Sequence, residues 1–235
     1  MPAALLTGVG RPNGIAAAAA RALAADGWDL GLHWYDEDPS HLKEELAVRV
    51  ALHRDDLADA GAPARTFDAL SAELGAFDAL LLVHTRCVAK GLLDTTAEEL
   101  DLHFATNVRA AMLMIQLFAA QLQSPEGRII ALTSDHFTPE NLAYGTSKAA
   151  LDRVVLAAAH ELGPRGISAN CINPGPNDTG WMTPEIYEDA KRKTPLGRVG
   201  LPEDAARLAR FLCSPAGGWV SGQVLYSNGA FRLNV

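Results

Sequence analysis

The most constraining feature of this sequence is an alternation of short apolar runs with longer segments of helical periodicity. Seven short runs have the near-continuous apolar character of strands buried on both faces: 3–7, 28–34, 48–53, 78–83, 128–134, 167–173 and 222–227. Helical segments alternate with them, at 14–26, 63–74, 96–122, 144–163 and 202–213. This rhythm predicts an α/β fold in which crossover helices connect the strands of a parallel sheet.

No linker or repeat interrupts this rhythm, so residues 1–235 are expected to form one domain. The chain is 49% hydrophobic, which is enough to bury a substantial core. Its net charge is -8, and it contains no dense run of Lys or Arg. Nucleic acids and anionic membranes require clustered positive charge. We therefore expect small molecules and further copies of this chain as partners, rather than nucleic acid or a membrane.

Three kinds of sequence signal are absent, and their absence narrows the expected location and chemistry of the protein. The first ten residues lack the charged and apolar regions of a secretion signal, and no stretch approaches the roughly 20 apolar residues of a membrane span. A cytoplasmic location is therefore expected. Cys87, Cys171 and Cys213 are odd in number and widely spaced, which favours reduced thiols over a disulfide framework. The seven histidines show no His-Glu-x-x-His spacing, and we expect no metal.

A glycine-rich loop, TGVGRPNGIA (7–16), follows the first expected strand and precedes the first expected helix. Glycines at this place let the backbone turn tightly and approach a pyrophosphate, which binds the free N–H groups at the helix start. An ordinary strand-to-helix turn is the alternative. The position in the first strand-to-helix connection, followed by small alanines, favours a dinucleotide site with Gly8, Gly10 and Gly14 in its loop.

Two tyrosine-lysine pairs have the same spacing of four residues, which places both side chains of each pair on one helix face. Tyr144 and Lys148 begin a strongly apolar helical segment, whereas Tyr187 and Lys191 lie among charged residues. A neighbouring ammonium stabilises a phenolate and lowers the pKa of the phenol, most effectively where water is scarce. Spacing alone does not separate the two pairs. Their settings favour Tyr144 and Lys148 as the chemical pair.

At this point the sequence resembles the short-chain dehydrogenases/reductases, and among them the bacterial 3-oxoacyl-carrier-protein reductases. The resemblance covers nearly the whole chain, through TGVGRPNGIA (7–16), NVRAA (107–111), TS (133–134), YGTSK (144–148), NPGPNDTGWM (173–182) and SGQVLYSNGAF (221–231). It implies a doubly wound, Rossmann-type fold with a seven-stranded parallel sheet and helices on both faces. It also implies a nicotinamide cofactor and an oligomer, a tetramer or a dimer.

The resemblance assigns four catalytic positions. Tyr144 would donate the proton to a carbonyl oxygen, Lys148 would support it, and Ser134 would hydrogen-bond the substrate. Asn107 matches an asparagine that anchors a proton relay to the lysine. Taken separately, Ser134 could be a turn residue and Asn107 a residue at a helix kink. Together they imply reduction of a ketone to a secondary alcohol, or the reverse reaction, by hydride transfer.

The resemblance also assigns the cofactor contacts: Gly8, Gly10, Arg11, Gly14, Ile15, Asp56, Leu57, Pro174, Gly175 and Thr179. An acidic residue after the second strand typically binds the ribose of NAD, whereas a nearby arginine accommodates the 2′-phosphate of NADP. His33, Trp34 and Tyr35 occupy that place, and Asp36 follows. Arg11 favours NADP(H), although it could instead pair with Asp36 or remain solvated, so NAD(H) stays possible. Thr179 could also be a helix N-cap.

The family pattern is broken after the fourth strand, where His84-Thr85-Arg86-Cys87 replaces the usual Asn-Asn-Ala-Gly. Arg86 could contact a cofactor phosphate, point to solvent or accompany a narrowed cleft. Ala16 also stands where a third glycine is common. These departures motivate an alternative hypothesis, a family member with a degenerate cofactor site that acts as a binding or regulatory subunit.

Residues 176–196 are expected to form a lid over the substrate, because Trp181, Met182 and Tyr187 combine apolar contact with a loop position. Asp135 and His136 are expected to line the pocket entrance. These features indicate a partly apolar carbonyl compound or alcohol. They do not identify the substrate or the direction of the reaction.

Overall fold

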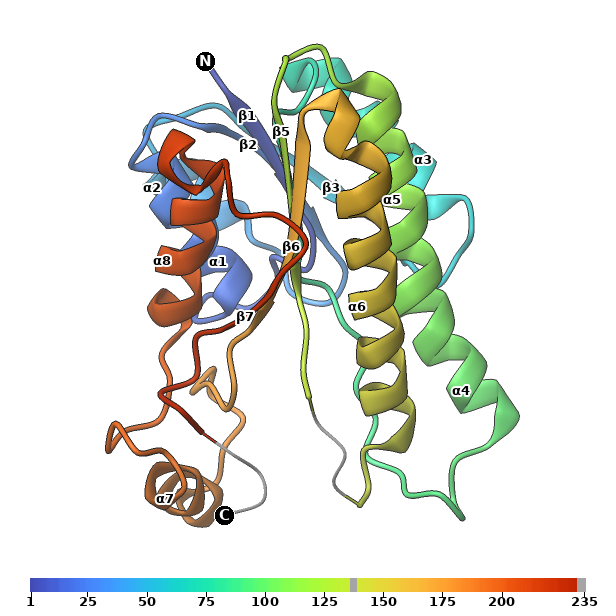
Figure 1. The fold of residues 1–235 in the computed structure, drawn as a ribbon, viewed down its shortest axis with the longest axis vertical. Coiled ribbons are helices and arrows are strands. Elements are labelled where there is room, and N and C mark those ends of the chain that lie inside the picture. The colour runs from blue at the N-terminus through green and yellow to red at the C-terminus, as the bar shows by residue number, and fades with distance from the viewer. Residues whose placement is uncertain (136–138, 232–235) are drawn as a thin grey trace.

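The chain folds around a parallel sheet, seen nearly edge-on in Figure 1. The computed structural model describes residues 1–135 and 139–231. Within these residues the sheet has seven strands in the order β3-β2-β1-β4-β5-β6-β7, all parallel. The strands are β1 (Ala3–Leu6), β2 (Asp29–Trp34), β3 (Val50–Arg54), β4 (Ala79–Leu82), β5 (Gly127–Leu132), β6 (Ile167–Asn173) and β7 (Val224–Tyr226). The predicted seven-stranded, doubly wound α/β fold is confirmed.

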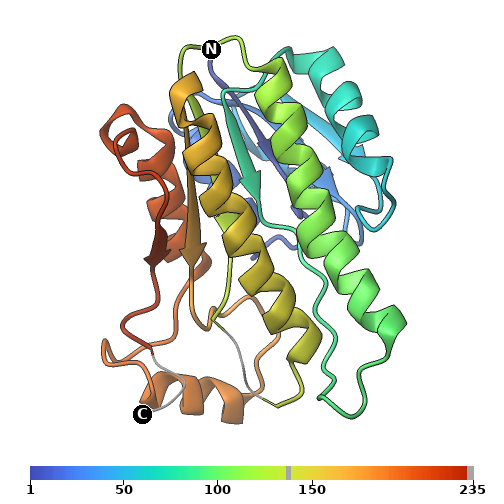
Figure 2. The same ribbon diagram turned by 45° about the vertical axis from the view of Figure 1, so that its right-hand side comes forward.

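Helices cover both faces of the sheet, as Figures 1 and 2 show. One face carries α1 (Ile15–Ala24), α2 (Ser40–Glu45) and α8 (Pro202–Cys213). The other face carries α3 (Ala62–Leu74), α5 (Ala110–Gln121) and α6 (Leu142–Leu162). Short 3₁₀ turns follow α6 at Gly163–Arg165 and α8 at Pro215–Gly217.

Two hydrophobic clusters, one on each face, account for this layering. Successive side chains of a strand point to opposite faces, so Leu5 joins the cluster under α5 and α6 while Leu6 joins the one under α1 and α8. The alanine run 16–20 of α1 is buried throughout, and its small side chains let α1 approach the sheet closely. The near-continuous apolar strands of the sequence are therefore strands that both helical layers cover.

The long helical segment expected at 96–122 is divided into three parts. It comprises α4 (Ala97–Phe104), a π-helical turn at Ala105–Arg109 and α5. π-helical turns often occur at functional sites, and Asn107 lies within this one. Two helices were not predicted, α2 and α7 (Pro184–Arg192). The α7 helix is short and highly charged, with its few apolar residues on one face, and it is stabilised locally by the Thr183 N-cap and by Pro184 at its first position.

The strand order reverses between β1 and β4, which creates the crevice where doubly wound sheets bind ligands. The loops after β1, β4, β5 and β6 meet at this edge, at the lower end of the sheet in Figure 1. In the described part of the chain, no helix has the length and apolar character needed to cross a lipid bilayer.

Candidate active site

The glycine loop leads from β1 into α1 at the crevice. Gly8 has a φ of 74°, and a Cβ atom there would lie 2.7 Å from the Cα of His84. Gly14 is the N-cap of α1, whose first turn has no acidic residue and no side-chain cap. The N–H groups at this helix start, from Ile15 onward, therefore face no competing side-chain oxygen. A backbone of this kind suits the pyrophosphate of a dinucleotide.

His84 is a buried part of the scaffold beneath this loop. Its Nδ1 atom lies 2.6 Å from Oγ1 of Thr7, and its Nε2 atom lies 3.0 Å from the carbonyl oxygen of Thr106. A carbonyl only accepts, so Nε2 carries the proton and the Thr7 hydroxyl donates to Nδ1. Burial lowers the pKa of His84 to about 3, which keeps the ring neutral. His84 thus joins β1, β4 and the π-helical turn, and its ring does not enter the cleft.

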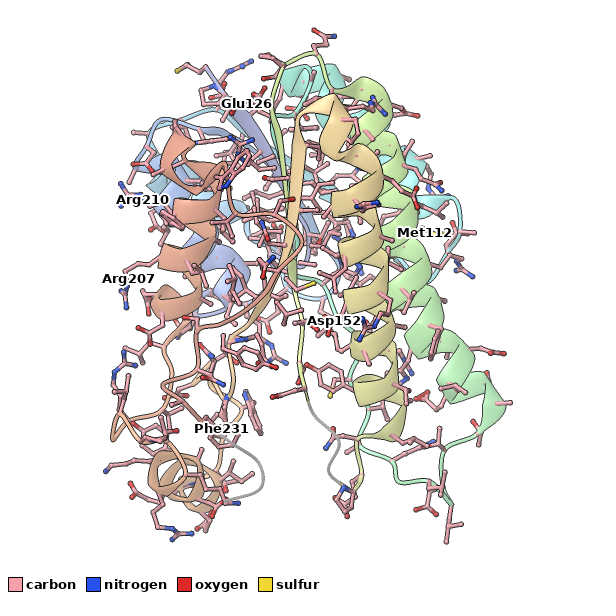
Figure 3. The ribbon with its side chains drawn as sticks, in the orientation of Figure 1. Met112, Glu126, Asp152, Arg207, Arg210 and Phe231 are labelled. Atoms are coloured by element: carbon pink, nitrogen blue, oxygen red, sulfur yellow. The ribbon has the colours of Figure 1, made fainter. Side chains whose placement is uncertain are left out.

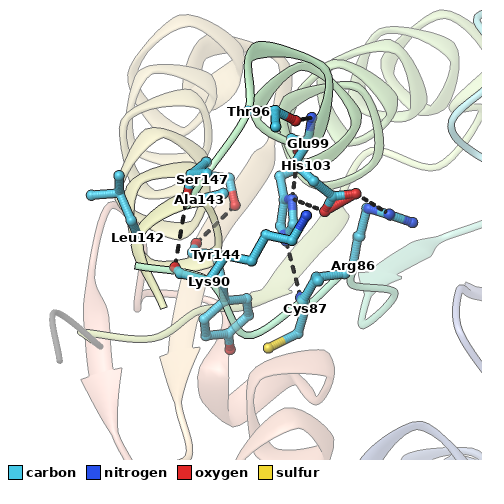
Figure 4. A network of polar contacts seen from close by, with 12 residues as sticks. Arg86, Cys87, Lys90, Thr96, Glu99, His103, Leu142, Ala143, Tyr144 and Ser147 are labelled. Carbon is cyan, nitrogen blue, oxygen red and sulfur yellow. Dashed lines mark hydrogen bonds and ion pairs between the residues drawn. The ribbon is translucent and has the colours of Figure 1, made fainter. Parts of the chain in front are cut away.

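Arg86 turns away from the crevice toward α4. Its Nη2 atom donates to Oε1 of Glu99 at 2.6 Å, as Figure 4 shows. The same segment is held by His103, whose Nε2 atom accepts from the N–H of Val88 at 3.2 Å. Three uses of Arg86 were left open by the sequence, and the structure adds a fourth. Arg86 pairs with a carboxylate of α4, and this ion pair fastens the segment that follows β4.

Asn107 connects this segment to α6. Its Oδ1 atom accepts from the N–H of Arg86 at 2.7 Å, and its Nδ2 atom donates to the carbonyl of Arg86 at 2.9 Å. Nδ2 also donates to Oγ of Ser147 at 2.9 Å, and Ser147 donates to the carbonyl of Tyr144 at 2.8 Å. Asn107 is 1% exposed. The side chain in the π-helical turn therefore positions the start of α6, where Tyr144 lies.

Tyr144, Lys148 and Ser134 meet at the carboxyl end of β5. A hydrogen bond joins the side chains of Tyr144 and Ser134, and it lowers the pKa of the phenol. Burial has the larger, opposite effect and raises the pKa of Tyr144 to about 12, with smaller contributions from nearby Cys87 and Asp135 in the same direction. Cys87 is exposed, and Figure 4 shows its thiol on the same side as the Tyr144 ring.

Lys148 is buried, and burial lowers the pKa of its ammonium to about 8. Its Nζ atom donates to the carbonyl of Leu132 at 2.8 Å. The sequence predicted that the ammonium would set the pKa of Tyr144 below its usual value, but the net direction is the opposite. Burial of the phenol dominates, and the ammonium is directed at Leu132. Tyr144 is therefore a protonated acid at neutral pH.

The second tyrosine-lysine pair lies on α7, apart from these residues. Lys191 forms a surface ion pair with Glu188 at 3.7 Å, and its side chain is 45% exposed. Tyr187 is partly exposed on the same short helix. No described catalytic residue contacts this pair, so the structure places it outside the constellation at the end of β5.

The ends of β2 and β3 form the other side of the crevice. Arg11 is exposed and forms no ion pair with Asp36 or any other described residue. Asp56 accepts a hydrogen bond from the N–H of Ala58 at 2.9 Å, which closes its own turn. Leu57 is 3% exposed and packs in the core, so its side chain faces away from any ligand.

The loop after β6 completes the crevice. Gly175 has a φ of 61°, and a Cβ there would lie 2.5 Å from the Cβ of Asn228. Thr179 is partly buried and does not cap α7, because Thr183 does so by accepting from the N–H of Ile186. The capping alternative for Thr179 is therefore wrong. Pro174 is partly exposed beside Gly175.

Sequence reasoning missed three residues that bear on this site. Arg54 at the end of β3 lies with its guanidinium carbon 5.3 Å from the ring centroid of Trp34, and its Nε atom donates to the carbonyl of Tyr35 at 3.0 Å. Cys87 lies beside Tyr144, and Asp152 lies four residues beyond Lys148. The spacing of Asp152 was a usable signal, whereas the other two contacts depend on the tertiary fold. His136 lies outside the described residues, and Asp135 is exposed.

Comparisons with known proteins identify a family and several oxidoreductases to which this chain is similar. A family model described as enoyl-(acyl carrier protein) reductase matches residues 8–231. YjdA of Bacillus subtilis, an uncharacterised oxidoreductase, is 34% identical over 241 residues and covers 97% of this chain and 96% of its own. A blue fluorescent protein from a metagenomic library, in complex with NADPH, has a TM-score of 0.91 and 30% identity, with 98% of each chain covered. The angucycline C-6 ketoreductase LanV with bound NADP has a TM-score of 0.90 and 26% identity, covering 97% of this chain and 94% of its own.

Proposed function

Because the chain belongs to the short-chain dehydrogenase/reductase family, we propose that it is an NADP(H)-dependent enzyme that interconverts a ketone and a secondary alcohol. The observation that carries this proposal is the meeting of Tyr144, Ser134 and buried Lys148 at the carboxyl end of β5, beside the glycine loop. NADP and NADPH in the titles of similar structures support the choice of cofactor.

The residues of the crevice suit a dinucleotide. The uncapped start of α1 and the backbone of Gly8, Gly10 and Gly14 would hold the pyrophosphate. Pro174, Gly175 and Thr179 would border the nicotinamide, and Asp56 with the backbone of Leu57 would border the adenine. When bound, the nicotinamide supplies or accepts the hydride.

The protein's own residues would handle the proton and the oxygen. In the reductive direction, the protonated Tyr144 hydroxyl donates to the oxygen of the carbonyl substrate as negative charge develops there. Ser134, already hydrogen-bonded to Tyr144, orients the same oxygen. The buried ammonium of Lys148 stabilises the phenolate that remains, and Asn107 holds the backbone of Tyr144 in register through Ser147.

Arg11 supports NADP(H) over NAD(H). It is exposed at the rim of the glycine loop and is not neutralised by a described carboxylate, so its guanidinium is free to contact a 2′-phosphate. Binding of NADPH and NADH, titrated by the fluorescence of the reduced nicotinamide, tests this preference. Arg11→Ala is expected to weaken NADPH binding selectively. Equal weakening of both cofactors would contradict the assignment of Arg11 to the phosphate.

The lid and the oligomer remain part of the proposal. Residues 176–196 include the exposed apolar side chains of Trp181, Ile186 and Leu196, which suit contact with a partly apolar substrate.

Leu100, Phe104 and Met112 are exposed along α4 and α5, and Met112 is labelled on the outer side of α5 in Figure 3. An exposed apolar stripe of this kind supports self-association, which light scattering coupled to size-exclusion chromatography would measure.

Turnover of a panel of ketones with NADPH tests the proposed reaction. Tyr144→Phe removes the proton donor with little change of shape, and it is expected to lower kcat by about 100-fold or more. Tyr187→Phe is the matched control on α7 and is expected to leave kcat unchanged. Loss of activity in the control variant alone would show that the proton comes from the other pair. Failure of the wild-type protein to bind either cofactor while folded would contradict the enzyme proposal.

A further inference from the structure

The face of α6 that carries the proposed catalytic pair extends by one more turn. Tyr144, Lys148 and Asp152 follow one another at intervals of four residues within α6, so their side chains lie in one row. Figure 3 shows Asp152 on α6, on the side toward the sheet. The row thus places a carboxylate one helical turn beyond the buried Lys148. The established family membership does not explain this carboxylate.

Asp152 lies in an unusual environment for a carboxylate. Its Oδ1 atom is buried and has no hydrogen-bond partner among the described residues. Burial raises the pKa of the carboxyl group, and side-chain hydrogen bonds with Thr133 from the end of β5 and Cys171 from β6 oppose this effect without reversing it. Asp152 is partly buried, and a charge shielded from water acts more strongly on a charged neighbour than an exposed one does.

That neighbour is Lys148, which is 2% exposed. Burial lowers the pKa of its ammonium, and electrostatic interactions with Cys171, Asp152 and Cys87 oppose this effect. The other titratable groups that face Lys148 are Cys171 on β6, Tyr144 on α6, and Cys87 and His84 after β4. Burial raises the pKa of both thiols and of the phenol and lowers that of His84, so all four are neutral at neutral pH.

Asp152 is therefore the group with negative charge among these described neighbours. Arg153, the next residue on α6, is exposed and lowers the pKa of Asp152, which favours the charged carboxylate. An opposite charge nearby favours the protonated form of a buried ammonium, in addition to the hydrogen bond that Lys148 donates to Leu132. Among the described neighbours, Asp152 is the group that supplies such a charge.

We propose that Asp152 is a positioning residue that keeps Lys148 protonated in its buried site, and so holds ready the cation that stabilises the phenolate of Tyr144. The catalytic part of this inference rests on the proposed ketoreductase function, whereas the charge state of Lys148 does not. Asp152 touches neither substrate nor cofactor in this role. It acts through Lys148 alone.

Titration of Lys148 in the cofactor-free protein tests the electrostatic part directly. The chain has five lysines, so ¹³C-labelling of their ε-carbons gives few NMR signals, and Lys148→Met identifies the buried one. In Asp152→Asn the titration midpoint of Lys148 is expected to fall by about 1 pH unit or more. Glu161→Gln removes a negative charge from the exposed end of the same helix and is expected to leave the midpoint unchanged.

Retention of the carboxylate supplies the second comparison. Asp152→Glu keeps the charge, and its Lys148 midpoint is expected to stay above that of Asp152→Asn. If the Asn variant does not fold, Asp152→Ser provides a second neutral side chain for the same titration. An unchanged Lys148 midpoint in the folded neutral variant would overturn the proposal, whatever the effect on stability.

The pH profile of ketone reduction tests the catalytic part. In Asp152→Asn the alkaline limb of kcat is expected to move to lower pH by the same amount as the Lys148 midpoint, while KM for the ketone stays unchanged at low pH. A shifted NMR midpoint with an unmoved alkaline limb would overturn the catalytic part alone. If no ketone is turned over by the wild-type protein, the proposed function fails, and the NMR titration still decides the role of Asp152.

Discussion

The Nδ1 atom of His84 lies 2.6 Å from the hydroxyl oxygen of Thr7, and this contact joins the end of β4 to the end of β1 beneath the glycine loop. The Nε2 atom of the same ring donates to the carbonyl of Thr106 in the π-helical turn. His84, which departs from the family pattern, is thus a buried structural residue that links β1, β4 and the π-helical turn. The hypothesis of a degenerate cofactor site loses its main support, because His84 and Arg86 both turn away from the crevice.

His84→Ala is expected to destabilise the protein. It leaves the Thr106 carbonyl without the His84 donor, which costs about 1–3 kcal/mol for a buried group, and it leaves the Thr7 hydroxyl with only its longer bond to the Leu81 carbonyl at 3.3 Å. Chemical unfolding monitored by circular dichroism measures the loss. His160→Ala, at an exposed position of α6, is the matched control and should change the free energy of unfolding little. Equal stability of the two variants would contradict the bracing role of His84.

Stability is expected to fall as the pH drops below the ordinary histidine pKa of 6.5. Burial lowers the pKa of His33 to about 4 and that of His84 to about 3, so both rings are neutral in the folded protein. The unfolded chain binds protons at higher pH than the folded one, and the stability present above pH 6.5 is lost progressively through these folded-state values. Each ring contributes a loss of roughly 2 kcal/mol between pH 7 and pH 5.

Unfolding free energies at pH 7, 6 and 5 measure this loss. His84→Asn cannot take up a proton, so its stability should depend less steeply on pH than that of the wild-type protein. His160→Gln should leave the slope unchanged, because this side chain is exposed. Parallel pH dependences of all three proteins would show that the buried rings do not govern acid sensitivity.

Gly8→Ala is expected to destabilise the glycine loop through two effects. A φ of 74° is unfavourable for alanine by about 1–2 kcal/mol. The new Cβ atom would also lie 2.7 Å from the backbone of His84, which the hydrogen bonds of the His84 ring hold in place. Gly27→Ala separates the two effects, because Gly27 has a φ of 80° and nothing within 4 Å of the built Cβ. Thermal unfolding should show a larger loss for Gly8→Ala, and NADPH binding should weaken in that variant alone.

Glu99→Gln is expected to loosen the segment that follows β4. The change removes the carboxylate that pairs with Arg86. The guanidinium, whose Nε atom is buried without a hydrogen-bond partner, then loses its neighbouring negative charge. Hydrogen exchange measured by mass spectrometry should increase in the peptide that contains residues 85–90. Asp189→Asn breaks a comparable pair with Arg192 on the surface of α7 and serves as the control. Unchanged exchange in Glu99→Gln would mean that Asn107 and His103 hold the segment without the ion pair.

Much of the fold followed from local patterns. The apolar runs located all seven strands to within a few residues, because strands buried on both faces must be apolar throughout. The helices α7 and α2 were missed, because both are short and charged residues occupy about half of their positions. The break at Ala105–Arg109 was also invisible, because a π-helical turn leaves the helical pattern of 96–122 almost unchanged.

The residues of the candidate site could also be predicted from the sequence in part. Residues that are near in sequence, such as Tyr144 and Lys148, could be paired by helical spacing, and the family motifs ordered the others along the chain. The direction of the Tyr144 pKa was not accessible in this way, because burial depends on everything packed around the ring. The same holds for Arg86, whose partner Glu99 is thirteen residues away on another element.

The sequence by itself determined the parallel sheet, the glycine loop at its first turn and the chemical types available at the crevice, since these depend on local periodicity and on residue identity. The tertiary structure alone decided which charges are paired and which groups are buried. Ionisation depends on desolvation and on neighbours from distant elements. For this reason, the burial of Lys148 and the neutral His84 beneath Gly8 become apparent only in the folded chain.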